Sequence, residues 1–217
     1  MKTKKIAVLG SGIVGQVLAT GFKKHGYSVT VGTGHPEKLQ EWKNSNSGIS
    51  ITDFEDAVNF GEIIVLALKG TIVVDLISKI NPAYLKGKTI IDATNPIDDQ
   101  AMPVNGVIKF FTGENESLMQ RLQNAVPEAN FVKAFNSVGN VFMVDPDFKG
   151  TKPTMFICGN NSDAKSEVKT ILEDFGWEAE DMGMIEAASS IESLCILWCI
   201  PGMLNNQWGH AFKLLKA

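Results

Sequence analysis

The sequence predicts an α/β protein with a doubly wound, mainly parallel sheet and a small α+β part at its C-terminal end. Short apolar runs alternate with segments of helical pattern along most of the 217 residues, which is typical of a parallel sheet with crossover helices. The run at residues 62–68 is continuously apolar after its first residue, as a strand buried on both faces should be. The first run, residues 6–9, ends in Gly10-Ser11-Gly12-Ile13-Val14-Gly15, and a helical pattern follows at once.

Each expected element follows from its local pattern. In the first 150 residues, strands are expected at residues 6–9, 28–31, 49–51, 62–68, 89–92 and 130–134. Helices are expected at residues 14–25, 36–43, from 53 onward, 71–80 and 116–125. Gly26 is a suitable C-cap for the first helix, and Pro36 stands where a proline favours the first helical turn.

The pattern changes after Gly150. Strands are expected at residues 154–158 and 177–181, and helices at residues 163–175, 186–200 and 205–215. We therefore predict one domain over residues 1–150 and a small C-terminal region over residues 151–217, although the sheet could continue across residues 137–152. The apolar run at residues 195–204 is too short to span a bilayer, and Pro201-Gly202 is expected to break it, so no membrane partner is predicted.

Composition excludes some classes of function. The formal net charge is −4 and no long basic block occurs, which argues against nucleic acid as a partner. Cys158, Cys195 and Cys199 do not cluster with histidine, so no metal site is predicted and buried core roles are favoured. An odd number of cysteines without a visible signal peptide suggests the reducing cytoplasm.

The glycine motif predicts that residues 1–150 are a Rossmann domain that binds a dinucleotide. Gly10 allows the tight turn, Gly12 lets the backbone approach a pyrophosphate, and Gly15 lets the helix pack on the strand. The N–H groups of the loop and first turn, which include Ser11, Ile13 and Val14, then bind the anion together with the positive end of the helix dipole.

The end of the second strand indicates which dinucleotide binds. Residues 31–36 carry no acid to bond a free ribose 2′-hydroxyl. Thr33 can donate a hydrogen bond to a 2′-phosphate, His35 and Lys38 can add positive charge, and Gly34 lies between them. The sequence therefore predicts NADP rather than NAD, with Glu37 expected to face away in the first turn of the next helix.

Three further segments reach the carboxyl edge of the sheet, where ligands bind in open α/β folds. They are Ala67-Leu68-Lys69-Gly70, Thr94-Asn95-Pro96 and Phe135-Asn136-Ser137, and Ala134 directly before the third is also expected to contact the cofactor. The amides of Asn95 and Asn136 could orient a nicotinamide or a flat second substrate, or could serve only as turn residues.

Groups for proton transfer are lacking at this edge. His25 ends a predicted helix, His35 lies toward the adenosine and His210 lies in the predicted C-terminal helix, so no histidine is placed where the nicotinamide would react. We therefore expect hydride transfer by positioning, to an acceptor that needs little acid–base help, such as a flavin or deazaflavin ring.

At this point the chain resembles the NADP oxidoreductase, coenzyme F420-dependent family, whose relatives include the cytoplasmic domain of the six-transmembrane metalloreductases. Residues 6–19, 31–39, 92–96, 132–137 and segments between 156 and 198 carry the resemblance. It implies NADP held by residues 10–15 and Thr33, and a second redox cofactor (F420, FMN or FAD) near Asn95, Asn136 and the C-terminal region. It also implies a homodimer, for which the apolar helix at residues 191–203 is the candidate interface.

The chain departs from its relatives at two places. Many relatives carry arginine at the position of Gly34, where it would pair with the 2′-phosphate. Relatives often have alanine and proline where this chain has Met182 and Met184, and methionine there could reshape the pocket of the second ring.

Two other functions remain open. The N-terminal motif is shared with imine and β-hydroxyacid dehydrogenases, although these usually complete their site with a larger helical domain than residues 151–217 could form. A non-catalytic NADP-binding module that senses redox state is also compatible with the lack of a proton-transfer group.

Overall fold

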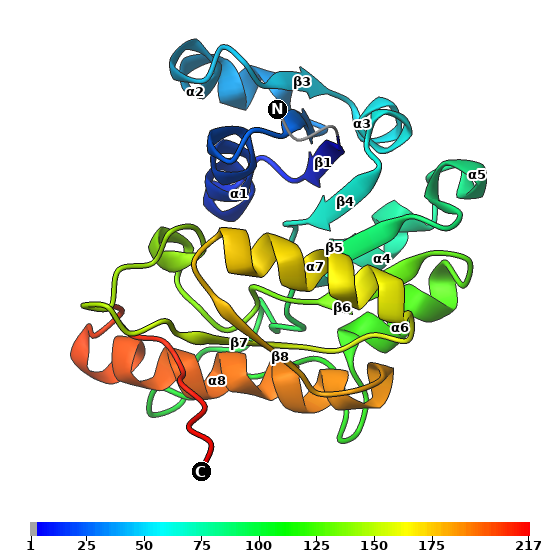
Figure 1. The fold of residues 1–217 in the computed structure, drawn as a ribbon. Helices are drawn as coiled ribbons and strands as arrows, with labels where there is room; N and C mark the ends of the chain where they lie inside the picture. The colour runs from blue at the N-terminus through cyan, green and yellow to red at the C-terminus, as the bar shows by residue number, and fades with distance from the viewer. Residues whose placement is uncertain (1–3) are drawn as a thin grey trace.

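The computed structural model describes residues 4–217 and contains a six-stranded parallel sheet (Figure 1). Its strands are β1 (Lys5–Leu9), β2 (Ser28–Gly32), β3 (Ser50–Thr52), β4 (Ile63–Leu66), β5 (Thr89–Asp92) and β6 (Asn130–Lys133). The strand order is β3-β2-β1-β4-β5-β6, and every neighbouring pair is parallel. The order reverses between β1 and β4, so the predicted doubly wound fold is confirmed.

Helices cover both faces of this sheet (Figure 1). The connections contain α1 (Ile13–Lys24), η1 (Pro36–Leu39), α2 (Gln40–Ser45), α3 (Phe54–Phe60), α4 (Gly70–Ile77), α5 (Pro82–Leu85) and α6 (Leu118–Ala125). Alternate side chains of β1 enter two separate cores: Ile6 and Val8 pack with α1 and α7, whereas Ala7 and Leu9 pack with α3, α4 and α6.

The C-terminal region adds a small sheet and further helices, and α7 shares a core with β1 and α1. After η2 (Asn140–Phe142) come β7 (Thr154–Ile157), α7 (Ser162–Asp174), β8 (Glu178–Asp181), η3 (Ile185–Ala187) and α8 (Ala188–Asn205). Strands β7 and β8 pair in parallel as a two-stranded sheet, and one antiparallel bridge between Lys133 and Cys158 joins it to β6. The six-stranded sheet therefore ends at β6 and does not run through into β7.

The prediction of a helix at residues 205–215 is wrong. Helix α8 ends at Asn205, Asn206 adopts a left-handed conformation (φ 54°), and residues 206–217 are irregular. The chain turns back because the Trp208 ring packs directly on Gly202, where an added Cβ would lie 2.2 Å from the ring. The tail then reaches β7, where Phe212 O accepts a hydrogen bond from Thr154 N (2.8 Å).

Two other local predictions need correction. Residues 36–43 form a 3₁₀ turn followed by α2, not one continuous helix. Pro201 does not break α8, which continues through it. The carbonyl that loses its helical partner belongs to Leu197, whose side chain is exposed, so water can replace the missing bond there.

The expectation that the apolar run near residues 195–204 is too short to span a bilayer needs correction. Among residues 4–217, the segment Ile185–Asn205 is the one helix long and apolar enough to cross a membrane by length and composition, and 39% of its apolar 18-residue stretch is buried inside the protein. Its one glutamate at the middle, Glu192, is 1% exposed and is paired with Lys133. In this structure the segment is a packing helix at the lower side of Figure 1.

Candidate dinucleotide-binding site

In the glycine loop after β1, two glycines have no room for a side chain, whereas the third faces open space. Gly10 has a φ of +128°, and a Cβ there would lie 2.2 Å from Ala67 O. A Cβ on Gly15 would lie 2.1 Å from Gly10 O, whereas one on Gly12 would meet no atom within 4 Å. The fold therefore requires Gly10 and Gly15, while the open space at Gly12 is where a ligand can approach the backbone.

Two helices leave their first N–H groups without a side-chain cap at this edge. Helix α1 starts after Gly12 and α4 after Lys69, both with no side-chain cap and no acid in the first turn. By contrast, α3, α6 and α7 are capped by Asp53, Ser117 and Asn161. Because β1 and β4 are neighbours, the two uncapped ends lie side by side, and free N–H groups of this kind are suited to bind an anion.

A cavity of about 320 Å³ opens along that edge. The predicted residues that line it are Gly12, Ile13, Val14, Ala67, Leu68, Lys69, Thr94 and Asn95. Gly70, which ends the first predicted segment, also lines it, and the sequence prediction missed the other three, which are Ala93, Ile97 and Asp99. Lys69 Nζ lies 2.9 Å from Asp99 Oδ2, so in this structure it is paired with a carboxylate.

The two predicted asparagines bind each other. Asn95 Nδ2 donates to Asn136 O (2.7 Å), and Asn136 Nδ2 donates to Asn95 Oδ1 (3.1 Å) and to Ile191 O (2.9 Å). Asn95 lies in the cavity wall, whereas Asn136 is 4% exposed and supports Asn95. Since both acceptors face its Nδ2, the orientation of Asn136 is fixed, and its buried Oδ1 has no partner among the described residues.

The remaining predicted residues lie beside the cavity wall. Gly10, Ser11 and Gly15 belong to the loop and helix start that carry Gly12. Pro96 follows Asn95, and Ala134 is fully buried directly after β6.

At the end of β2, Thr33 is buried and already bonded. Its Oγ1 donates to Ser11 Oγ (3.0 Å) and accepts from His35 N (3.1 Å), which leaves the Ser11 hydroxyl hydrogen free for a ligand. Glu37 does not face away as expected: its Oε1 lies 3.2 Å from His35 Nδ1. The 3₁₀ turn that starts at Pro36 brings the two side chains together. Lys38 is exposed.

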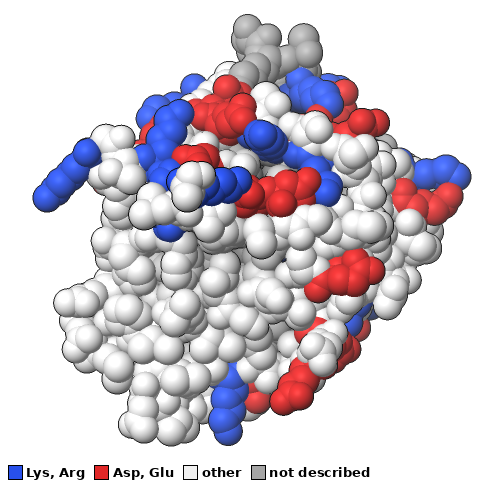
Figure 2. All heavy atoms as spheres, turned by 60° about the horizontal axis from the view of Figure 1, so that its bottom comes forward, with Lys and Arg blue, Asp and Glu red and all other residues white. Residues whose placement is uncertain are grey.

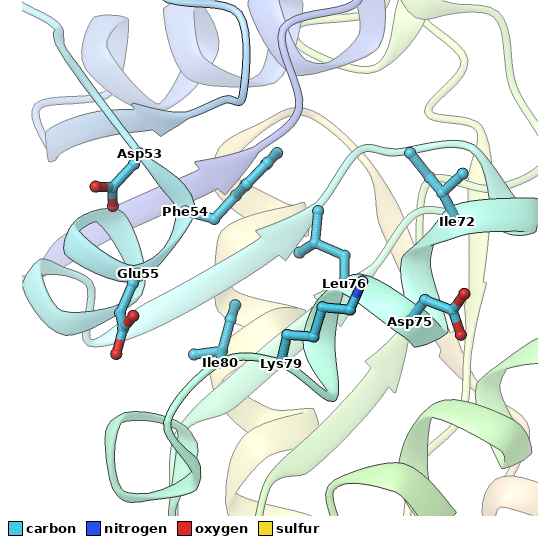
Figure 3. Close-up of a pocket in the computed structure, with 8 residues that line it drawn as sticks. All are labelled: Asp53, Phe54, Glu55, Ile72, Asp75, Leu76, Lys79 and Ile80. Carbon is cyan, nitrogen blue, oxygen red and sulfur yellow. The ribbon is translucent and has the colours of Figure 1, made fainter.

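A second cavity, of about 570 Å³, lies between α3 and α4 beyond the end of β2 (Figure 3). Phe54, Leu76 and Ile80 lie between the two helices, and the carboxylates of Asp53 and Glu55 point away from them. A Cβ on Gly34 would lie 3.6 Å from the Phe54 ring, so one residue of the cavity lining lies near the end of β2.

A buried ionic network that the sequence prediction missed stands behind the cavity. Lys133 Nζ lies 2.7 Å from Asp92 Oδ2 and 2.8 Å from Glu192 Oε1, and none of the three side chains is more than 1% exposed. Burial alone would lower the pKa of Lys133, but Asp92 and Glu192 outweigh it, so the pKa is raised. The signal in the sequence that could have indicated this network is one charged residue in each of three apolar segments, namely Asp92, Lys133 and Glu192.

The three cysteines are buried and free. Burial raises the pKa of Cys158 to about 12, and the Cys199 hydrogen bond together with burial raises the pKa of Cys195. Cys158 and Cys195 are therefore core residues rather than nucleophiles, whereas the hydrogen bond with Cys195 lowers the pKa of Cys199. Within residues 4–217, no group of three or more histidine, cysteine or acidic side chains is placed to hold a metal ion.

Comparison with known proteins shows which family model and which proteins this chain is similar to. Residues 5–96 match the family model described as NADP oxidoreductase, coenzyme F420-dependent. The chain is 26% identical over 204 residues to metalloreductase STEAP3 of Rattus norvegicus, which is 92% of this chain but 39% of that protein. It therefore spans well under half the length of that curated relative.

Solved structures agree. A candidate F420-dependent NADP-reductase of Arthrobacter sp. FB24 superposes with a TM-score of 0.91 at 29% identity, covering 98% of this chain and 100% of that one. An imine reductase of Pseudomonas sp. superposes with a TM-score of 0.65 at 20% identity over 89% of this chain and 60% of its own, which shows a shared fold alone.

These findings support an NADP-dependent oxidoreductase as the general class. The resemblance seen in the sequence is confirmed, since residues 5–96 match the model of the NADP oxidoreductase, coenzyme F420-dependent family.

Proposed function

We propose that this protein transfers hydride between NADP(H) and a flat redox acceptor of the F420 or flavin type. The observation that carries the proposal is the pair of uncapped helix ends, α1 and α4, at one cavity of a sheet edge. Unbonded N–H groups at a helix start attract phosphate, and these two point at the same space.

In this proposal the dinucleotide lies along the carboxyl edge. Its pyrophosphate binds at Gly12, Ile13 and Val14, and its 2′-phosphate lies near Thr33, Gly34, His35 and Lys38, where the Ser11 hydroxyl can donate. The adenine enters the cavity beside Phe54 and stacks on apolar side chains. The nicotinamide then reaches the wall formed by Thr94 and Asn95.

The acceptor is proposed to stack on the nicotinamide, near Asn95 and the C-terminal region. The family description and the name of the Arthrobacter protein support F420, and the metalloreductase relative adds ferric chelates as acceptors to test. The wall contains no histidine, so the reaction depends on orientation, which suits direct hydride transfer between two rings. Met182 and Met184 are about half exposed and available to such a ring.

We also propose that the protein is a homodimer that buries the outer face of α8. Leu197, Met203 and Leu204 are about half exposed there, and the face that Figure 2 turns forward has a broad area without charged residues. A helix that is apolar on all sides is normally covered on all sides. Sedimentation velocity tests this: a monomer at micromolar concentration would contradict it.

Turnover tests the function. Oxidation of NADPH is followed by its fluorescence with F420, FMN, FAD or a ferric chelate as acceptor. We expect turnover with at least one ring acceptor and a slower reaction with NADH. Tight NADPH binding without turnover would instead support the redox-sensing module, and turnover only with imines or hydroxy acids would contradict the proposed acceptor class.

A further inference from the structure

Glu192 is a residue of α8 that the function proposed above leaves unused, yet its carboxylate accepts three bonds. Oε1 lies 2.8 Å from Lys133 Nζ and accepts from Met119 N (3.1 Å), and Oε2 accepts from Leu118 N (3.0 Å). Both amides belong to the first turn of α6. Glu192 therefore joins α8, α6 and β6 at one buried point.

Lys133 links Glu192 to the cavity wall through its other hydrogen bonds. Its Nζ also donates to Asp92 Oδ2 (2.7 Å) and to Thr94 O (2.9 Å). Asp92 Oδ1 accepts from Thr94 N (2.9 Å) and Thr94 Oγ1 (2.6 Å). The backbone that presents Thr94 and Asn95 to the cavity is thus held at its carbonyl, its amide and one hydroxyl.

A second route leads from α8 to the same wall. Ile191, the residue before Glu192, accepts a hydrogen bond from Asn136 Nδ2, which also donates to Asn95 Oδ1. Two successive residues of α8 therefore fix Asn95, one through its side chain and one through its backbone.

The charges of Lys133, Asp92 and Glu192 explain why these side chains and the start of α6 must come together in the folded protein. Two carboxylates face one ammonium group, so the network carries an excess negative charge in a buried place. The amides and the positive dipole end of α6 offset that excess at Glu192. The Ser117 capping box bonds the Gln120 amide and leaves the Leu118 and Met119 amides for Glu192.

We propose that Glu192 is a positioning residue for hydride transfer: through Lys133 and Asp92 it fixes the 93–96 segment, and with it the geometry of the nicotinamide against Asn95. The rate effect rests on the proposed function, but the structural effect does not. Because the pyrophosphate binds at the other end of the cavity, the network acts on the rate of transfer more than on dinucleotide affinity.

Glu192→Gln keeps the size of the side chain and removes its charge. Whichever way the amide turns, its NH₂ group meets a donor, either Lys133 or an α6 amide. We expect kcat to fall about ten- to a hundredfold, because small misplacements of reacting groups have effects of that size. The Kd for NADPH should change less than threefold, and the side-chain amide NMR signals of Asn95 and Asn136 should shift or broaden.

Three further variants complete the test. Glu192→Asp keeps the charge on a shorter side chain and should recover part of kcat; it also replaces Glu192→Gln if that variant does not fold. Asp181→Asn breaks the Lys165–Asp181 pair, which lies outside the network, and should leave the amide signals unchanged. Leu172→Ala, in the buried face of α7, is a destabilised control outside the network.

Unchanged amide signals and unchanged kcat in Glu192→Gln would overturn the proposal, as would losses no larger than those in Leu172→Ala. If the wild-type protein neither binds nor oxidises NADPH, the proposed function fails. The amide signals would then still decide whether Glu192 positions Asn95.

Discussion

Two regions of the site differ in their hydrogen bonding. The glycine-loop edge, formed by Gly12 and the starts of α1 and α4, leaves backbone donors unbonded. In the Glu192 network, formed by Glu192, Lys133 and Asp92, the polar groups are bonded. At the edge, α1 and α4 start without side-chain caps and Gly12 faces open space. In the network, Lys133 has three oxygen partners and both carboxylates accept several bonds. Unsatisfied donors bind a ligand, whereas satisfied groups hold a shape. The edge should therefore determine affinity, and the network should determine stability and geometry.

Lys133→Met has the largest expected effect on stability. It leaves Asp92 and Glu192 buried without their cation, and breaking such a pair costs about 3–5 kcal/mol of unfolding free energy. Urea denaturation measures it. A loss below about 1 kcal/mol would mean that the network does not hold the fold.

The same residue sets an expected pH dependence. Because the pKa of Lys133 is raised above its ordinary 10.5, its charge stabilises the fold at all pH values below that, and this contribution is lost as the pH rises through the raised value. Wild-type stability should therefore fall in alkali more steeply than that of Lys133→Met.

Gly12→Asp should weaken NADPH binding at the glycine-loop edge without destabilising the fold. A Cβ at Gly12 meets nothing within 4 Å, so the melting temperature should hardly change. The new carboxylate would face the pyrophosphate, and like charges in contact cost several kcal/mol, so affinity for NADPH should fall at least about a hundredfold. NADPH fluorescence titration measures this. Gly10→Ala is the contrast: it should destabilise the protein because its Cβ would collide with Ala67 O.

Gly34→Arg tests the 2′-phosphate position with a smaller effect. The nearest atom to an added Cβ is Phe54 Cε2 at 3.6 Å, so the side chain can be accommodated. A guanidinium bonded to the 2′-phosphate should tighten NADPH binding about tenfold and leave NADH binding unchanged. Equal gains for the two nucleotides would place the 2′-phosphate elsewhere.

Glu116→Gln has the smallest expected effect, which is confined to the local stability around Gly113. Hydrogen bonds from Arg121 and from the Gly113 amide lower its pKa from 4.5 to about 2. Its stabilising contribution is therefore present above pH 4.5 and is lost as the pH falls toward 2. In Glu116→Gln, the Gly113 amide should exchange faster with solvent at neutral pH, and its exchange should no longer depend on this titration.

Sequence reasoning succeeded where the signal was local. The glycine motif is contiguous, and the alternation of apolar runs with helical patterns was enough to predict the parallel sheet and its order of elements. The Asp92–Lys133 pair spans 41 residues, and nothing local to either residue indicates the other. The helix expected at residues 205–215 failed for the same reason, because Trp208 packs on Gly202 instead of continuing the helix. Contacts between distant segments decide such features, and periodicity does not report them.

Calorimetric titration of the wild-type protein with NADPH, and in parallel with NADH, tests the central claim most directly. If the uncapped ends of α1 and α4 form a dinucleotide site, NADPH should bind at one site per chain and more tightly than NADH. Absence of binding heat for both nucleotides across the temperature range, with the protein folded, would contradict the account.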